Sequence, residues 1–306
     1  SAYDSRFSML TGLRPLDALL PRAAARFGSK AASLAALTAA LTRSSPLWFG
    51  LTGVLFGVHV LNRPNVLVPV AAVVVVLLLV RQWKPAALVV AGLVLALVPT
   101  TVRNISVTGD WSLLPSHGGL NFYIGNAAEA NGLYRAIPGV RPNILGQAVD
   151  AKRVAEAATG RSLTDAEVSA HFSGLAWDWI RHHPHAWARL LAQKTYYTLH
   201  GQHIALPLSY PFYVNDTGSA LRVFAVGPWL LIPLGLAGLW WGLDIRRQDH
   251  LVWLAYVPGT IASVALFFVA ERYRLPLLVP LIIGSGVALD QLARLVATRS
   301  WPSLTA

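Results

Sequence analysis

Six apolar runs constrain the fold of this chain more than any other feature of its sequence. They form two groups of three, at residues 46–62, 64–81 and 85–102 and at residues 221–242, 250–270 and 275–295. Each run is close to the ~20 residues that an α-helix needs to cross the hydrocarbon core of a bilayer. The sequence therefore predicts an all-α integral membrane protein, a multi-pass helical bundle with about six spans.

The composition agrees with a bilayer environment. Hydrophobic residues make up 55% of the chain, charged residues only 13%, and the mean hydropathy is +0.51. A soluble domain carries roughly 25% charged residues. The net charge of +11 is scattered along the chain, which fits an anionic lipid surface and excludes the basic stripe expected of a nucleic-acid-binding protein. The absence of cysteine excludes disulfides and thiolate metal sites.

The apolar runs divide the chain into segments. Residues 46–102 and 221–298 are expected to hold three transmembrane helices each, and residues 103–220 form a polar segment between them. In that segment Thr164 and Glu167 have the spacing of a capping box, followed by apolar residues at helical spacing. We therefore expect residues 103–220 to form a small, mostly helical cap.

The two ends of the chain are less informative. In residues 1–45 the Ala/Leu run at 31–41 is too short to span a membrane, so it is either a half-helix or the start of the next span. Residues 299–306 form a short tail.

Basic residues predict the orientation of the spans. If the spans alternate in direction, one side receives Arg43, Arg81, Lys84, Arg246, Arg247, Arg294 and Arg299. By the positive-inside rule this side is cytoplasmic, together with the tail. The protein is then expected in the plasma membrane, with residues 103–220 on its extracytoplasmic face.

Several arginines break this charge bias because they lie at the outer ends of spans. They are Arg63, Arg103, Arg272 and Arg274, and Tyr273 lies between the last two. Guanidinium groups that converge at a membrane surface bind phosphate in a bidentate manner, which makes these residues candidates for a phosphate site. The alternative is that they reach lipid phosphates or pair with Asp110 or Glu271. Since Glu271 and Arg274 are three residues apart and can pair on a helix, Arg272 with Tyr273 is the favoured phosphate ligand.

A glycine-rich stretch opens the polar segment. Gly118, Gly119 and Gly125 allow a tight turn or the close approach of a ligand, and amides and aromatic rings surround them. Amides suit sugar hydroxyls and rings suit pyranose faces, although most turn-rich loops are only turns. The candidate residues for a sugar or acceptor loop are Ser116, His117, Gly118, Gly119, Asn121, Tyr123 and Asn126.

The histidines do not predict a metal site. The groups at 182–185 and at His200 and His203 have no carboxylate at the spacing that a zinc site needs, so a polar face at the membrane surface explains them better. A need for a divalent metal is neither predicted nor excluded. The sequence also contains no phosphate-binding loop, dinucleotide-binding glycine pattern or nucleophile elbow.

The order of these motifs resembles the bacterial GT-C membrane glycosyltransferases, the group of the aminoarabinose and protein O-mannosyltransferases. The resemblance covers residues 46–298, and its most specific parts are Gly118–Asn126 and Arg272–Pro276. It implies a transferase that takes a sugar from a polyprenyl-phosphate carrier and passes it to an acceptor at the outer face of the membrane. The implied partners are this lipid-linked sugar and the bilayer, with no nucleic acid, no certain cofactor and no particular oligomeric state.

One departure from the family concerns the catalytic base. In the family a carboxylate in the first outer loop acts as the base, but before Pro46 only Asp4 and Asp17 are acidic, and neither follows an apolar span. We therefore expect the base to lie upstream, so that this chain holds the donor-binding half and no catalytic residue, which would leave it inactive alone. The alternatives are a non-enzymatic transporter or lipid-carrier flippase and a structural assembly subunit. Transporters, however, place polar groups at the bilayer midplane.

The orientation can be tested with cysteines introduced on the two sides. In intact cells we expect an impermeant thiol reagent to label Glu129→Cys in the cap and to leave Gln248→Cys in the cytoplasmic turn unlabelled. The opposite labelling pattern would overturn the orientation and the outer-face chemistry with it.

Overall fold

The computed structural model describes residues 31–108, 118–204 and 227–298. Within these ranges the chain is helical, and extended structure is limited to one isolated bridge between Leu133 and Val269. The prediction of an all-α fold is therefore confirmed for the described residues. The candidate residues Ser116 and His117 lie outside them.

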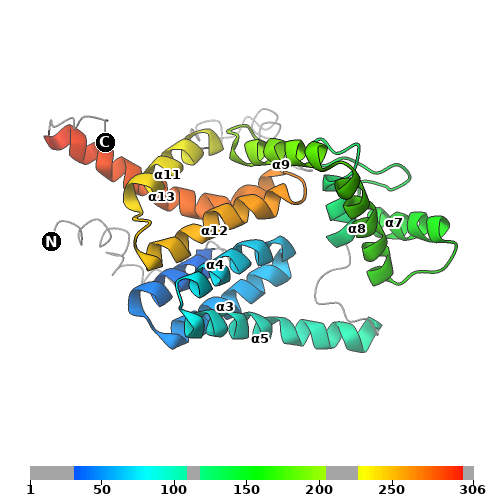
Figure 1. The fold of residues 1–306 in the computed structure, drawn as a ribbon, viewed down its shortest axis with the longest axis horizontal. Coiled ribbons are helices and arrows are strands. Elements are labelled where there is room, and N and C mark those ends of the chain that lie inside the picture. The colour runs from blue at the N-terminus through cyan, green and yellow to red at the C-terminus, as the bar shows by residue number, and fades with distance from the viewer. Residues whose placement is uncertain (1–30, 109–117, 205–226, 299–306) are drawn as a thin grey trace, which may run out of the picture.

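The bundle is formed by the apolar helices (Figure 1). A helix at residues 31–43 precedes α3 (Pro46–Asn62), the 3-10 turn η1 (Pro64–Val66), α4 (Leu67–Leu79), α5 (Trp83–Thr108), α11 (Pro228–Gly242), α12 (Gln248–Ala265) and α13 (Glu271–Thr298). Helix α3 packs on α5, α11 packs on α13, and α4 packs on α12. The α4–α12 contact thus joins the two groups of helices that the sequence separates.

In its described part, the cap between the two groups contains four helices. They are α6 (Gly118–Gly125), α7 (Ile144–Thr159), α8 (Asp165–His182) and α9 (Pro184–Leu199). Helix α8 packs against both α6 and α7, and α9 packs against α12. Figure 1 shows α7, α8 and α9 gathered at the end of the bundle where α12 leads into α13. The prediction of a mostly helical segment is confirmed for the described part of it.

Among the described residues, two helices are long and apolar enough to cross a membrane. These segments are Trp83–Ser106 of α5 and Glu271–Ala297 of α13, and the apolar helices Pro46–Asn62, Pro64–Leu79 and Pro228–Gly242 are shorter. By length and composition alone, two helices are thus candidate spans. The arrangement with six spans stays a prediction.

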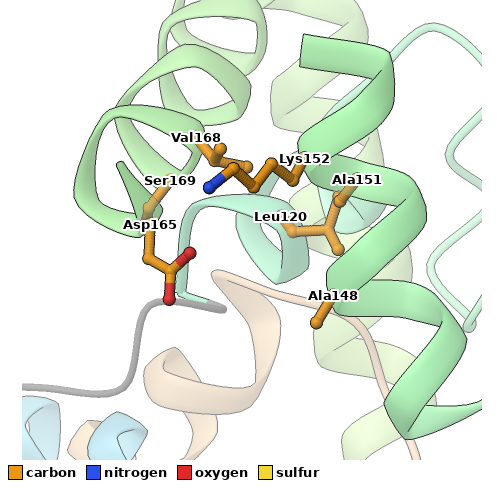
Figure 2. Close-up of a pocket in the computed structure, with 7 residues that line it drawn as sticks. All are labelled: Leu120, Ala148, Ala151, Lys152, Asp165, Val168 and Ser169. Atoms are coloured by element: carbon orange, nitrogen blue, oxygen red, sulfur yellow. The ribbon is translucent and has the colours of Figure 1, made fainter. Parts of the chain in front are cut away.

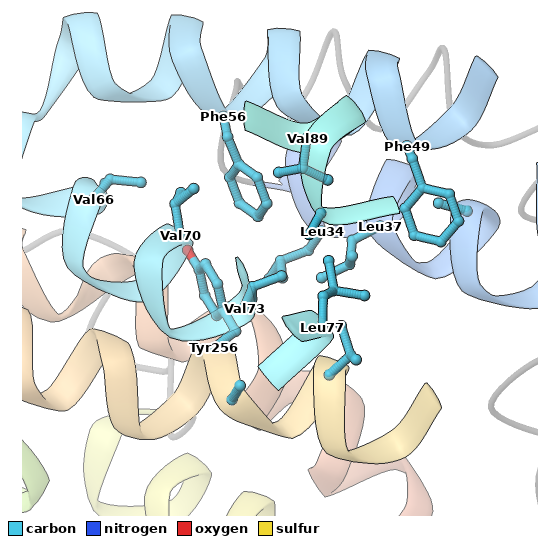
Figure 3. Packing of buried hydrophobic residues seen from close by; sticks show 14 of the residues in the cluster. Leu34, Leu37, Phe49, Phe56, Val66, Val70, Val73, Leu77, Val89 and Tyr256 are labelled. Atoms are coloured by element: carbon cyan, nitrogen blue, oxygen red, sulfur yellow. The ribbon is translucent and has the colours of Figure 1, made fainter. Parts of the chain in front are cut away.

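The largest apolar core joins the first group of helices to α12. Figure 3 shows Leu34 and Leu37 beside Val73 and Leu77 of α4, in the same cluster as Tyr256 of α12. The side chains of these residues are buried. Residues 31–43, for which the sequence allowed two interpretations, therefore lie in a helix that packs into this core.

Glycines bring the helix pairs of the bundle into backbone contact. A Cβ atom at Gly53 of α3 would collide with the backbone of Val89 in α5, and one at Gly238 of α11 would collide with Gly284 in α13. Such close approach is typical of helix pairs in lipid, where small residues allow dispersion contacts and replace the hydrophobic driving force.

Helix α8 begins at the predicted capping box. The Thr164 hydroxyl accepts a hydrogen bond from the Glu167 amide at 3.3 Å, and the Glu167 carboxylate accepts one from the Thr164 amide at 2.8 Å. Arg161 pairs with the same carboxylate at 2.7 Å. These bonds satisfy amide groups that the first turn of the helix cannot pair internally. The prediction of a helix that starts after Thr164 is confirmed.

Removing the cap should therefore loosen the start of α8. We expect Thr164→Ala to cost about 1 kcal/mol locally. Hydrogen exchange over residues 165–172 should then become roughly fivefold faster, while α3 and α5 stay protected. Thr159→Ala is the control, because the Thr159 hydroxyl bonds only to carbonyls of its own helix α7. An unchanged rate in Thr164→Ala would show that the capping box contributes nothing to α8.

Candidate functional site

The turn between α12 and α13, residues 266–270, connects the cap to the bundle. Its Leu266 carbonyl accepts a hydrogen bond from the Asn126 side chain at 2.8 Å, and its Val269 amide donates to the Gly132 carbonyl at 2.8 Å. The next amide, of Glu271, donates to the Ile204 carbonyl at 2.9 Å. Three separate cap segments thus fix this connecting turn, and with it the first turn of α13.

Two of the predicted phosphate ligands meet at Tyr273. The Arg272 guanidinium donates to the Tyr273 hydroxyl at 2.8 Å, and its Cζ lies 4.9 Å from the ring centroid. The Cζ of Arg63, which follows α3, lies 5.4 Å from the same centroid. The fold therefore brings together Arg63, Arg272 and Tyr273 from sequence positions far apart.

The positive charges of Arg63 and Arg272 are not balanced by acidic side chains in the described structure. In the described ranges, neither Arg63 nor Arg272 forms an ion pair with a carboxylate. Arg63 is half-buried, and burial lowers its pKa, an effect that Tyr273 partly offsets and Arg272 reinforces. Arginine nevertheless stays charged in proteins. Two like charges beside one ring are an arrangement that a bound anion would stabilise.

The Tyr273 ring belongs to a row of packed aromatic side chains. Phe268 of the connecting turn meets it edge-on at 5.5 Å, and Tyr134 of the cap meets Phe268 at 5.4 Å. Edge-to-face pairs of this kind fix ring orientation and contribute about 0.5–1.5 kcal/mol each beyond area burial. These ring contacts with the cap therefore help to fix the orientation of Tyr273.

Arg274 is in a different environment. Its side chain is buried and donates to the carbonyls of Tyr197, His200 and Gln202 at 3.1, 2.6 and 2.7 Å. It also bonds to the Glu271 carboxylate, which confirms the pairing expected from their spacing. This geometry favours a structural role, since Arg274 ties the end of α9 to the start of α13.

Arg103 is not part of the group at Tyr273. Its side chain is exposed near the end of α5, and no ion pair or ring contact joins it to Arg63 or Arg272 among the described residues. In Figure 1 this end of α5 stands apart from α12 and α13. Of the arginines selected from the sequence, the structure thus joins two at one place.

The glycine-rich stretch was predicted as a loop, and this is wrong for its described part. Residues Gly118–Gly125 form helix α6. A Cβ atom at Gly119 would collide with Ser169 of α8, and one at Gly125 with Phe267 of the connecting turn. The Gly119 amide also donates to the Ser169 hydroxyl at 3.0 Å. These glycines therefore permit close helix packing.

The polar residues of this stretch differ in their surroundings. Tyr123 packs against Phe172 of α8 at 5.6 Å, and burial, followed by the nearby Glu129, raises its pKa. Asn121 is half-buried. Asn126 is fully buried and donates to the carbonyls of Phe122 at 2.9 Å and Leu266 at 2.8 Å. Asn126 is thus a bridge between the end of α6 and the connecting turn.

Lys194 of α9 was not among the candidate residues selected from the sequence. Its side chain is fully buried, and its amine donates to Asn126 Oδ1 at 3.0 Å, as does Trp187 Nε1. Burial lowers the pKa of Lys194 to about 7. The helical spacing of Trp187, Leu190 and Lys194 could have placed this lysine on the inner face.

One pocket lies between α6, α7 and α8 (Figure 2). It is lined by Leu120, Ala148, Ala151, Lys152, Asp165, Val168 and Ser169. Its volume of about 40 Å³ suffices for a few water molecules and not for a sugar ring.

Two histidines at the end of α8 contact groups of the preceding turn of the same helix. His182 Nδ1 lies 2.8 Å from the Asp178 carbonyl, and the His183 ring stacks on Trp179 at 5.6 Å. In the part of the chain that the structure describes, no cluster of three His, Cys, Asp or Glu side chains could hold a metal ion.

Comparison of the chain with known protein families, curated proteins and solved structures finds no match. The function is accordingly argued from the geometry around Tyr273.

The structural role of Arg274 predicts that its loss destabilises the cap. In Arg274→Met three carbonyls lose a donor and Glu271 loses its partner, which should cost about 3–5 kcal/mol. Thermal unfolding should shift to lower temperature, and exchange over residues 197–204 should accelerate. Arg294→Met, at the exposed Arg294–Asp290 pair of α13, should change neither. A variant of Arg274 as stable as the parent would contradict this role.

Proposed function

We propose that this chain is the donor-binding part of a GT-C-type membrane glycosyltransferase. It would bind a polyprenyl-phosphate-linked sugar and support transfer of that sugar to an acceptor at the outer face of the plasma membrane. The observation that carries the proposal is the pair of guanidinium groups, of Arg63 and Arg272, beside Tyr273 without an acidic partner among the described residues.

The surface of the bundle supports a membrane location. Only 22% of the apolar window in α5 and 39% of that in α13 is buried, whereas a core helix of a soluble protein is mostly buried. Large apolar side chains exposed along these helices include Leu95, Val102, Ile282 and Val296. Continuous apolar surface of this kind is stable in lipid and aggregates in water. Six spans, with the cap on the extracytoplasmic side, form the topology that we propose.

Exposed tryptophans agree with this placement. Trp83 is the first residue of α5 and is 64% exposed, while Trp240, near the end of α11, is 84% exposed. Tryptophan settles at the level of the lipid headgroups, where its ring is apolar and its N–H is hydrated. Both residues lie near the basic turns that the orientation assigns to the cytoplasmic side.

Phosphate is the anion that suits the pair of arginines best. The planar guanidinium fork matches two phosphate oxygens, and two forks can hold the group from two directions. In the proposed reaction the acceptor attacks the anomeric carbon, and the bond from that carbon to the phosphate oxygen breaks. The lipid phosphate then leaves with the bonding electrons. Arg63 and Arg272 would stabilise the negative charge as it develops.

The proposal also requires a base to accept the proton of the acceptor. Glu271 is the acidic residue nearest to Tyr273 in sequence, but its carboxylate holds Arg274 and receives the Ile204 amide at 3.3 Å. It is therefore poorly suited to proton transfer. We propose that the base is supplied from outside the described residues, as the resemblance to the family implies.

A lipid-carrier flippase is the second candidate. Transporters form their binding sites near the bilayer midplane. The two candidates differ in their product, because a transferase releases polyprenyl phosphate and a flippase leaves the sugar on its carrier.

The proposed donor site is tested by Arg272→Lys in the complete protein. A lysine keeps the charge but cannot form the bidentate contact, and loss of one charge-assisted contact is worth about 2–3 kcal/mol. Sugar transfer from a polyprenyl-phosphate donor should therefore fall roughly thirtyfold to more than a hundredfold in kcat/KM. Thermal stability should be unchanged because Arg272 is exposed.

Arg246→Lys is the matched control, since Arg246 lies in the turn on the opposite side. It should leave transfer unaffected. If transfer also survives Arg272→Lys and Arg63→Lys, the phosphate site lies elsewhere. If the sugar crosses the bilayer on its carrier without transfer, the flippase is correct.

A further inference from the structure

The contact between α9 and the connecting turn passes through one buried lysine. Lys194 is fully buried, and the Cβ position of Gly132 lies 3.4 Å from its Cγ, so segment 126–135 covers it. Its amine and the indole of Trp187 both donate to Asn126 Oδ1, each at 3.0 Å. Through the second hydrogen bond of its amide, Asn126 then holds Leu266. Lys194 thus sits at the centre of the cap–bundle contact.

A charged ammonium fits this place poorly. It has three N–H groups, and the only acceptor bonded to the Lys194 amine in the described structure is Asn126 Oδ1. A neutral amine that donates one hydrogen bond costs far less free energy to bury. A buried, uncompensated charge is among the most costly features of a protein interior.

The surrounding titratable groups do not supply compensation. Segment 126–135 carries Glu129 and Arg135, α6 carries Tyr123, and α12 carries Tyr256 and, at its far end, Asp249 and His250. Helix α9 adds His185, Arg189, Tyr196, Tyr197 and His200, and the start of α13 adds Glu271, Arg272, Tyr273 and Arg274. None of these forms a hydrogen bond or ion pair with Lys194 in the ranges described.

We propose that Lys194 is a proton-sensitive latch between the cap and the bundle. The cap is docked most firmly when the amine is neutral, and proton uptake by Lys194 loosens α6 and α9 from the connecting turn. The proposal rests on the packing around Asn126 and does not depend on glycosyl transfer. Because the same turn leads into Arg272 and Tyr273, loosening it would also shift the two guanidinium groups.

The direction of the pH dependence follows from linkage. Desolvation lowers the pKa of Lys194 in the docked cap to about 7, whereas an undocked, hydrated lysine has a pKa of about 10.4. Between these values opening takes up one proton, so docking becomes more stable as the pH rises. Below about pH 7 Lys194 is protonated in both the docked and the undocked cap, so the stability of docking no longer depends on pH.

Hydrogen exchange of the full chain in lipid nanodiscs between pH 5.5 and 9 measures this opening. After correction for intrinsic exchange, opening over residues 118–126 and 184–199 should decrease about tenfold per pH unit above pH ~7. Below pH ~7 the opening of these residues should not change with pH. Peptides of α3 and α5 serve as the internal reference and should show no such slope.

Two variants separate the latch from ordinary packing. Lys194→Met removes the titrating group, so opening should be independent of pH and no greater than in the parent at pH 7. Lys194→Gln keeps a neutral donor for Asn126 and should also abolish the slope, which covers the case that Lys194→Met does not fold. Lys152→Met, at another lysine of the cap, is the matched control and should keep the parental slope.

A parental chain without a slope above pH ~7 would overturn the proposal. The same follows if Lys194→Gln retains the parental slope, because another group would then be titrating. Abolition of the slope in both Lys194 variants, with its retention in Lys152→Met, would establish the latch.

Discussion

The contacts of Arg274 are the interaction on which the arrangement of this molecule most depends. One buried guanidinium gathers three carbonyls from the end of α9 and the segment that follows it, and pairs with Glu271 at the start of α13. These carbonyls have no partner in a regular helix, so without the guanidinium the end of α9 would be buried at a cost. Because Tyr273 and Arg272 directly precede Arg274, the same bonds fix the backbone that presents the candidate phosphate site.

Different forces hold the two parts of the molecule together. Within the bundle, glycines such as Gly53 and Gly238 bring helix backbones into contact, and cohesion comes from dispersion. Between the cap and the bundle, buried polar groups, namely Asn126, Lys194 and Arg274, add to the aromatic packing around Phe268. Polar contacts of this kind are strongly directional, and each loses much of its value when one partner is removed. The loss of a single polar partner is therefore expected to matter more at the cap than in the apolar bundle.

The features that could be predicted from the sequence are local. The apolar runs predicted the bundle helices, the spacing of Thr164 and Glu167 predicted the start of α8, and the spacing of Glu271 and Arg274 predicted their pairing. Helical spacing could have placed Lys194 on the inner face of α9, but no local pattern identifies the groups that cover it there, Asn126 and the segment around Gly132. The convergence of Arg63 and Arg272 was hypothesised only because guanidinium groups suit a phosphate site. Their contacts with the Tyr273 ring are visible only in the folded structure.

The helix at residues 31–43 has a consequence for biosynthesis. Leu34 and Leu37 share their core with Tyr256 of α12, which is translated roughly 200 residues later. At ~5–20 residues per second this core stays incomplete for about 10–40 s after residues 34–37 emerge. During that interval Leu34 and Leu37 can pack only against the helices made before α12, such as α4. The burial of the first described helix is therefore completed only when the second group of helices has been made.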